Sequence, residues 1–244
     1  MKATTLDSED ISARVGLQTI SWGPRIHDLA KFASTAAKIG YTGIEFAQAP
    51  HTLPEGSALK KILQESDLTL LGFAGGSLRS RVEYAAEAEP LYLYLDEWDL
   101  GAAQYAFDAG LTVAIHPHVY KDIDTVQAAL KYLDDFPQAR LILDTAHAFL
   151  VGDDLCQIIT QHWSRILAVH LKDWTSKFGR SASRFARGFT ALGRGELSQQ
   201  VREVVQLLRE RRFPGWIIVE QDSPEGDPSL CAASSRDWLR QIGV

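Results

Sequence analysis

Short apolar runs alternate with longer amphipathic segments along the chain. A continuous apolar run is typical of a strand buried on both faces of a parallel sheet, and alternation with helical segments indicates repeated βα units. The runs predict strands over residues 14–21, 41–47, 68–74, 91–96, 112–118, 141–147, 166–173 and 216–222. The amphipathic segments predict helices over residues 29–39, 57–66, 100–109, 124–136, 154–162 and 199–211.

Eight strands with a helical pattern after nearly every one predict a (β/α)8 barrel, the TIM-barrel form of the α/β class. The length of 244 residues suits such a barrel. Because no linker rich in Pro, Gly or Ser divides the chain, we expect residues 1–244 to form a single domain. Residues 1–13 are expected to be a loose lead-in to the first strand, and their polar, acidic start lacks the apolar core of a signal peptide.

One long segment, residues 175–195, shows no regular pattern and lies between the seventh strand and its helix. Segments of this length are usually functional or disordered, and here we expect an active-site loop over the barrel mouth. The loop carries Arg180, Arg184, Arg187 and Arg194. These guanidinium groups are suited to binding phosphate or carboxylate, although arginine is also common on solvated loops.

Composition and charge narrow the class of protein. The apolar fraction of 45% is ordinary for a globular domain, and no apolar stretch approaches the ~20 residues that a membrane span needs. The net charge of −6 argues against a surface that binds nucleic-acid phosphates. Cys156 and Cys231 fit neither a metal-binding spacing nor a disulfide framework, so we expect a reducing, cytoplasmic location.

The last four predicted strands each end on a residue that can bind a metal or transfer a proton. In a barrel of parallel strands all carboxyl ends lie on one face, so these residues should converge there. Imidazole and carboxylate together suit Zn, Mn, Fe or Co better than Ca. The sequence therefore predicts a metal site formed by His116, Asp144, His170 and Glu220. For Asp144, a helix cap at the strand end is the alternative interpretation.

The ordered set of motifs resembles the sugar phosphate isomerase/epimerase superfamily with the xylose isomerase-like barrel. The motifs that carry this resemblance lie at residues 16–22, 40–45, 143–147, 169–173, 192–196 and 215–222. The pairing of His-Leu-Lys-Asp with Val-Glu-Gln-Asp is most similar to the inosose dehydratase and isomerase branch. The resemblance implies a divalent ion (Mn, Co, Zn or Mg) held by Glu, Asp, His and Glu on strands five to eight. The chain departs from this pattern at strand five, where His116 stands in place of glutamate.

The strand-end positions and the resemblance together suggest roles for further residues. Glu220, His116 and Lys172 are the candidate catalytic groups, with Lys172 stabilising an enolate or binding a phosphate. His116 and His118 flank Pro117, and we expect only His116 to look into the barrel mouth. The candidate substrate contacts are Trp22, Glu45, His118, His147 and Arg194. Simple packing, a structural salt bridge or a solvated surface position is the alternative for each of them.

The implied activity is that of a metal-dependent sugar or cyclitol isomerase or epimerase, acting through an enediolate on a hydroxyketone. A dehydratase of a keto-cyclitol would expel a β-hydroxyl from the same intermediate and is the alternative. A nuclease of the endonuclease IV type is disfavoured by the seven histidines and the acidic charge. The departure at His116 keeps a non-catalytic sugar-binding relative open. We expect a small sugar or cyclitol as the partner, no nucleic acid or membrane, and leave the oligomeric state open, a homo-oligomer included.

Overall fold

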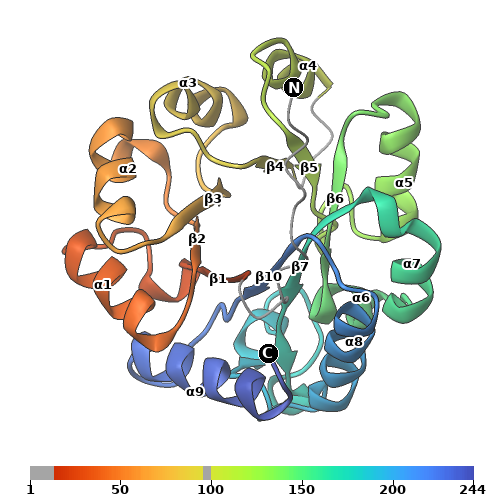
Figure 1. The fold of residues 1–244 in the computed structure, drawn as a ribbon. Coiled ribbons are helices and arrows are strands. Elements are labelled where there is room, and N and C mark those ends of the chain that lie inside the picture. The colour runs from red at the N-terminus through yellow and green to blue at the C-terminus, as the bar shows by residue number, and fades with distance from the viewer. Residues whose placement is uncertain (1–13, 96–99) are drawn as a thin grey trace.

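A computed structural model describes residues 14–95 and 100–244. Eight parallel strands form one sheet in the order β3-β2-β1-β10-β7-β6-β5-β4, and the helices ring it (Figure 1). The prediction of a TIM barrel is therefore confirmed. The barrel strands are β1 Val15–Gln18, β2 Gly43–Phe46, β3 Thr69–Phe73, β4 Leu93–Leu95, β5 Val113–Ile115, β6 Arg140–Asp144, β7 Ile166–Leu171 and β10 Trp216–Val219. The expected lead-in at 1–13 and residue 96 of the expected fourth strand lie outside the described residues.

The two ends of the sheet, β3 and β4, meet to give a nearly closed barrel. The amide of Leu91 donates to the Leu70 carbonyl at 3.2 Å, and that of Tyr92 to the Leu71 carbonyl at 3.0 Å. The chains approach so closely here that a Cβ on Gly72 would lie 2.8 Å from the Tyr92 carbonyl oxygen. Glycine at residue 72 is therefore a condition for this closure.

The helices occupy the outer ring of the barrel (Figure 1). They are α1 Leu29–Ile39, α2 Gly56–Gln64, α3 Leu78–Ala88, α4 Leu100–Asp108, α5 Val126–Asp135, α6 Thr145–Val151, α7 Leu155–His162, α8 Ser198–Glu210 and α9 Pro228–Gln241. All six predicted helices are present with ends within two residues of expectation. In α1, for example, Asp28 caps the first turn by accepting from the Lys31 amide, and Gly40 ends the helix at a φ of +102°.

Three helices, α3, α6 and α9, were not predicted. In α3 and α9 the buried face includes Arg81 and Arg236, which interrupt the apolar period that marks a helix in sequence. Arg236 is satisfied inside the protein by the carbonyl oxygens of Gly40 and Val244. The helix α6 begins at Thr145, directly after β6, so the expected strand 141–147 was too long by its last three residues.

Two apolar layers hold the barrel together. Seven side chains fill its interior, and a larger cluster packs between the strands and the outer helices. The interior members are Leu71, Tyr92, Tyr94, Ala114, Ile142, Ala168 and Ile218. Because these interior side chains are apolar, the buried polar groups of the strands lie together at one end of the barrel.

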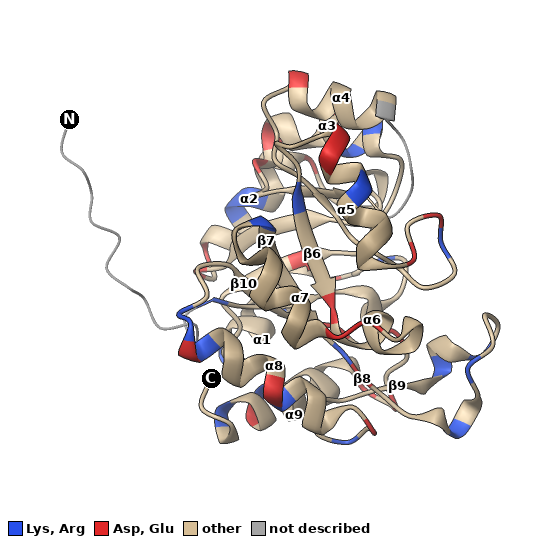
Figure 2. Cartoon of the chain, turned by 90° about the vertical axis from the view of Figure 1, so that its right-hand side faces the viewer, with Lys and Arg blue, Asp and Glu red and all other residues tan. Residues whose placement is uncertain are grey.

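The segment 175–195 is more ordered than its irregular pattern suggested. A short antiparallel pair, β8 Asp173–Trp174 with β9 Phe189–Thr190, encloses residues 175–188, and two 3-10 turns lie between the two strands. The indole N–H of Trp174 donates to the Phe185 carbonyl at 2.9 Å, which ties the loop to its base. Figure 2 shows Lys and Arg positions spread along this segment as it projects beyond β8 and β9.

No helix among the described residues is long and apolar enough to cross a membrane.

The tight approach at the β3–β4 closure leads to a prediction for stability. Gly72→Ala should lower the free energy of unfolding by about 1–3 kcal/mol, because the added methyl group must displace the backbone of Tyr92. Urea denaturation measures this change. Ser57→Ala on the exposed side of α2 is the control and should stay within about 0.5 kcal/mol of the parent. Equal stabilities of the two variants would contradict a closely packed closure.

Candidate active site at the carboxyl ends of the strands

The four predicted strand-end residues lie at one end of the barrel. Asp144 is the last residue of β6, His170 lies within β7, and His116 and Glu220 directly follow β5 and β10. All four are buried. The expected convergence at the carboxyl ends of the strands is therefore present in the structure.

His116, Asp144 and His170 form a group that could hold a metal ion. One potential ligand atom from each lies within 4.8 Å of the others. His116 Nε2 lies 3.7 Å from Asp144 Oδ2, and neither atom makes a hydrogen bond with a described residue. Buried polar atoms of this kind are costly unless they find a partner, and a cation supplies one. The donor set therefore fits a divalent ion.

Asp144 both caps a helix and faces the metal-capable group, so the two interpretations of its position are compatible. Its Oδ1 accepts from the amides of Ala146 and His147 at 2.9 Å each and so caps α6. Its Oδ2 points towards His116 and Lys172. Burial opposes ionisation of Asp144, but the neighbouring His147 and Lys172 outweigh it and lower its pKa well below the usual range. The group therefore stays anionic.

His170 is held between two glutamates. Its Nδ1 lies 2.5 Å from Glu220 Oε2, and its Nε2 lies 3.2 Å from Glu45 Oε1. The hydroxyl of Tyr92 donates to the second oxygen of Glu45 at 2.6 Å. Burial opposes protonation of His170, but Glu45 and Glu220 outweigh it and raise its pKa to about 10. Without a metal, His170 is therefore an imidazolium at neutral pH.

Glu220 lies outside the three-residue group. One of its oxygens contacts His170, and the other lies 2.9 Å from the ammonium of Lys172. Burial opposes its ionisation, but Lys172 and His170 outweigh it and lower its pKa. Both oxygens are thus engaged by cations, and the role of Glu220 as a metal ligand stays a prediction.

Lys172 lies fully inside this end of the barrel, with 1% of its side chain exposed. Its Nζ contacts Glu220 Oε1 at 2.9 Å, Asp222 Oδ1 at 3.1 Å and Asp144 Oδ2 at 3.4 Å. Burial disfavours the charged lysine, but the three carboxylates outweigh it and raise its pKa well above the usual value. Lys172 is therefore a fixed cation of the site.

A cavity of about 180 Å³ opens beside these groups. It is lined by Gln18, Ile20, Ala47, Ala74, Gly75, Tyr94, His116, His118, Glu220 and Asp222. The expectation that only His116 faces the mouth is wrong, because β5 ends at Ile115 and both histidines line the cavity beyond it. Burial, assisted by Lys172, lowers the pKa of His118 to about 4, so its imidazole is neutral.

Asp222 is a site residue that the sequence analysis did not assign. Burial raises its pKa to about 7, against the opposing charge of Lys172. It lies two positions beyond Glu220, and alternate residues of an extended segment point to the same side. The Glu-Gln-Asp spacing was therefore a signal that could have revealed it.

The remaining predicted substrate contacts lie in different surroundings. Glu45 is buried beneath the mouth against Tyr92 and His170. His147, in the first turn of α6, packs at a tilt against His118 with ring centroids 3.9 Å apart. Trp22 and Arg194 do not line the cavity. Trp22 packs edge-on against Phe32 at 5.0 Å, and Arg194 is exposed beside α9.

Asp173, next to Lys172, anchors the loop behind the site. Its carboxylate accepts from the amides of Trp174, Gly193, Gly195 and Leu197 and from the hydroxyl of Ser198. A Cβ on residue 195 would lie 2.2 Å from this carboxylate, so glycine is needed there. The Gly-Arg-Gly-Glu motif therefore has a structural role, because the amides of its two glycines donate to this carboxylate.

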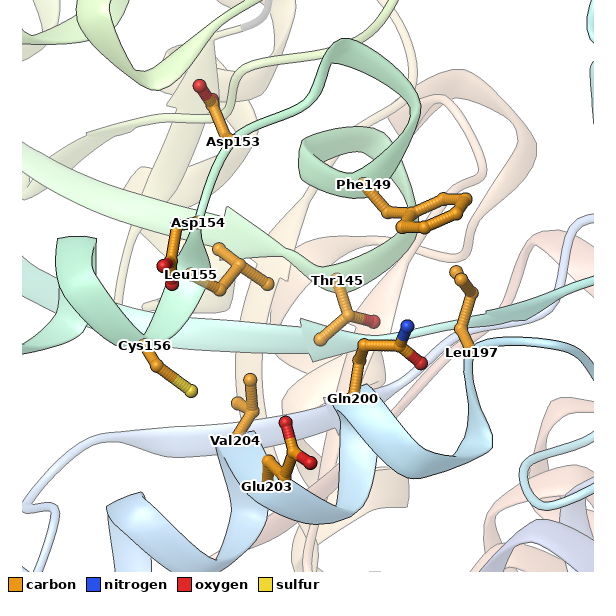
Figure 3. A pocket seen from close by; sticks show the side chains of 10 residues that line it. All are labelled: Thr145, Phe149, Asp153, Asp154, Leu155, Cys156, Leu197, Gln200, Glu203 and Val204. Carbon is orange, nitrogen blue, oxygen red and sulfur yellow. The ribbon is translucent and has the colours of Figure 1, made fainter.

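A second cavity, of about 200 Å³, lies between α6, α7 and α8 (Figure 3). Its lining consists of Thr145, Phe149, Asp153, Asp154, Leu155, Cys156, Leu197, Gln200, Glu203 and Val204. None of these residues belongs to the metal-capable group or contacts the ammonium of Lys172. Asp153 and Asp154 instead accept from the amides of Val126 and Gln157. We therefore place the candidate active site in the barrel mouth.

The fold and the site together define the class of protein: a TIM barrel that carries imidazole and carboxylate groups at the carboxyl ends of its strands. The chain belongs to the xylose isomerase-like TIM barrel family, whose family model matches residues 93–242. The resemblance inferred from the motifs is thereby confirmed.

Among curated proteins, the chain is similar to inosose dehydratases. It is 25% identical over 195 residues to that of Clostridium botulinum (strain Alaska E43 / Type E3), covering 72% of this chain and 65% of the relative. It is also 25% identical to that of Geobacillus thermodenitrificans (strain NG80-2), covering 68% of this chain and 62% of the relative. The matches thus span less than two thirds of the length of these relatives.

Solved structures share the fold at low sequence identity. A 3-keto-D-glucoside 4-epimerase from E. coli superposes with a TM-score of 0.69 at 16% identity, covering 94% of this chain and 98% of the other. The IolI protein with a bound zinc atom superposes with a TM-score of 0.74 at 14% identity, covering 94% and 97%. At these identities the likeness supports the barrel fold alone.

The anchor at Asp173 can be tested by mutation. Asp173→Ala removes the acceptor for four amides, two of which are in fully buried hydrogen bonds, and each unsatisfied buried donor costs about 1–3 kcal/mol. We expect a loss of more than about 3 kcal/mol in the free energy of unfolding, measured by urea denaturation. The exposed neighbour Glu196, changed to Gln, is the control and should cost much less. A small loss for Asp173→Ala would show that the loop does not depend on this carboxylate.

The position of His170 between Glu45 and Glu220 predicts a pH dependence of stability in protein treated with a chelator. The pKa of about 10 in the folded protein lies above the ordinary histidine value of 6.5. The stabilisation is therefore complete below about pH 6.5 and is lost as the pH rises through about 10. Urea midpoints should fall between pH 7 and 10, and His170→Gln should remove most of that fall. An equal decline in both proteins would contradict the assignment.

Proposed function

We propose that this protein is a hydro-lyase that removes water from a polyhydroxy ketone of the cyclitol or sugar class. One observation carries the proposal: Asp222, a carboxyl group with a pKa of about 7, lines one cavity together with His116 of the metal-capable group, and the ammonium of Lys172 contacts Asp222 at 3.1 Å. The similarity to inosose dehydratases supports dehydration rather than isomerisation as the outcome.

His116, Asp144 and His170 would hold the ion, and their two imidazoles favour Zn, Co, Mn or Fe over Mg. When bound, such an ion polarises a carbonyl oxygen and so makes the neighbouring C–H group more acidic. The three donors lie in or directly after three neighbouring strands of one sheet, which sets their spacing before a substrate arrives.

Asp222 would act as the general base and acid. Its carboxyl group lines the cavity, and a pKa near the working pH is what proton transfer requires. The carboxylate would take the proton next to the carbonyl, which leaves an enediolate. The same proton would then go to the β-hydroxyl as its C–O bond breaks, so that one water leaves and a double bond remains.

Lys172 and Glu220 would support this chemistry in different ways. The Lys172 ammonium lies 3.1 Å from Asp222, where its charge would stabilise the negative oxygen of the enediolate. Glu220 has a lowered pKa and is engaged by two cations, so it is a weak base. We assign it the task of orienting Lys172 and His170.

Epimerisation or isomerisation through the same enediolate is the second candidate. It needs a second proton carrier, and His118 lines the cavity from the β5 end while Asp222 lines it from the β10 end. A proton returned from a different side would change configuration without loss of water.

Incubation of the metal-loaded protein with keto-cyclitols and ketoses in deuterated water should distinguish these reactions. We expect a product lighter than the substrate by one water, detected by mass spectrometry. Asp222→Asn should lower kcat by on the order of 10²–10⁴-fold, because it removes the proton carrier. The same variant should remain folded and keep its metal content, which serves as the internal control.

Two outcomes would count against dehydration. Deuterium in a product that has lost no water would favour epimerisation or isomerisation. The absence of both exchange and water loss across the panel, with metal bound, would favour a non-catalytic binding protein.

A further inference from the structure

The ammonium of Lys172 contacts an oxygen atom that also belongs to the metal-capable group. Asp144 Oδ1 is occupied by two backbone amides, which leaves Oδ2 for a cation. That Oδ2 lies 3.4 Å from Lys172 Nζ and 3.7 Å from His116 Nε2. An ion bound between His116 and Asp144 would therefore meet an ammonium that already contacts its carboxylate ligand.

We propose that Lys172 is a resident cation of this site that competes with the divalent ion for Asp144 and thereby sets the metal affinity. The inference rests on the metal site of the proposed function and concerns how tightly that site binds.

The backbone holds Lys172 next to Asp144. The amide of Lys172 donates to the hydroxyl of Thr145 at 2.8 Å, and that hydroxyl donates to the Lys172 carbonyl at 2.8 Å. Because Thr145 directly follows Asp144, the lysine cannot move away from the cluster as a whole. Only its side chain can change partners.

The ammonium also has other partners that would remain after an ion takes Asp144. Glu220 Oε1 and Asp222 Oδ1 lie at 2.9 and 3.1 Å, both closer than Asp144, and the ring of Phe189 lies 4.8 Å away. A shift of Lys172 from Asp144 towards Glu220 and Asp222 would therefore leave no buried charge without a partner. Competition is feasible because Lys172 would lose only one of its three carboxylate partners.

The electrostatic consequence is a weakened site. A positive charge close to a divalent ion in a dry environment repels it with little screening. Groups around metal ligands typically change affinity by on the order of 10–100-fold. Removal of the Lys172 charge should thus strengthen metal binding, whereas a lysine that merely supports the fold should weaken binding when it is lost.

The test is a titration of chelator-treated protein with Zn²⁺ and Co²⁺, followed by competition with a coloured chelator and by the Co²⁺ absorption spectrum. We expect Lys172→Met to bind on the order of 10-fold more tightly than the parent protein. Lys172→Arg, which keeps the charge, should stay near the parent value. Lys177→Met removes the same charge from an exposed position of the loop and is the matched control.

If Lys172→Met does not fold, Lys172→Gln gives the same comparison with a side chain that can still hydrogen-bond Glu220. In the parent protein, an ammonium resonance assigned to Lys172 by ¹⁵N NMR should shift on addition of Zn²⁺. Unchanged or weaker affinity in the neutral variant, or an unshifted resonance, overturns the competition and leaves the proposed function standing. Failure of the parent protein to bind either ion overturns this inference together with the metal site.

Discussion

The balance of buried charge is the constraint on which the rest of the site depends. Glu45, Asp144 and Glu220 are buried in the barrel, and Asp222 lies beside them. Ionised carboxylates are very costly in such surroundings unless cations neutralise them. Lys172 lies among three of these groups and the His170 imidazolium between two, so each carboxylate has a cationic neighbour. This pairing holds the carboxylates and the two cations in place.

Two carboxylates, Asp144 and Asp173, also hold the backbone around the mouth. Asp144 caps α6 with one oxygen and keeps the other directed at the cluster. Asp173 gathers the amides of the loop after β9 onto a single carboxylate. Because these bonds join the strand ends to the segments that follow them, the side chains of the mouth are positioned before any ligand binds. Such preorganisation is what both metal binding and proton transfer require.

Much of the architecture could be predicted from the chain alone. Continuous apolar runs marked the buried strands, and an amphipathic period marked six helices. Two of the missed helices have a common cause, since α3 and α9 bury arginines that donate to backbone oxygens outside their own helix. A local pattern contains no information on such partners, so a buried arginine looks like an exposed one. The helix α6 was hidden because it starts where β6 ends, without a connecting loop.

For the candidate site, the sequence by itself determined which chemical groups reach the barrel mouth. Parallel strands place their carboxyl ends on one face, so His116, Asp144 and His170 had to converge once the strands were recognised. Only the tertiary structure decided what each group contacts. It directed Glu220 to His170 and Lys172, gave Asp222 a pKa of about 7, and left Trp22 and Arg194 away from the cavity. The physical reason is that charge pairing and burial depend on distances between residues far apart in the chain, whereas strand ends depend on local pattern.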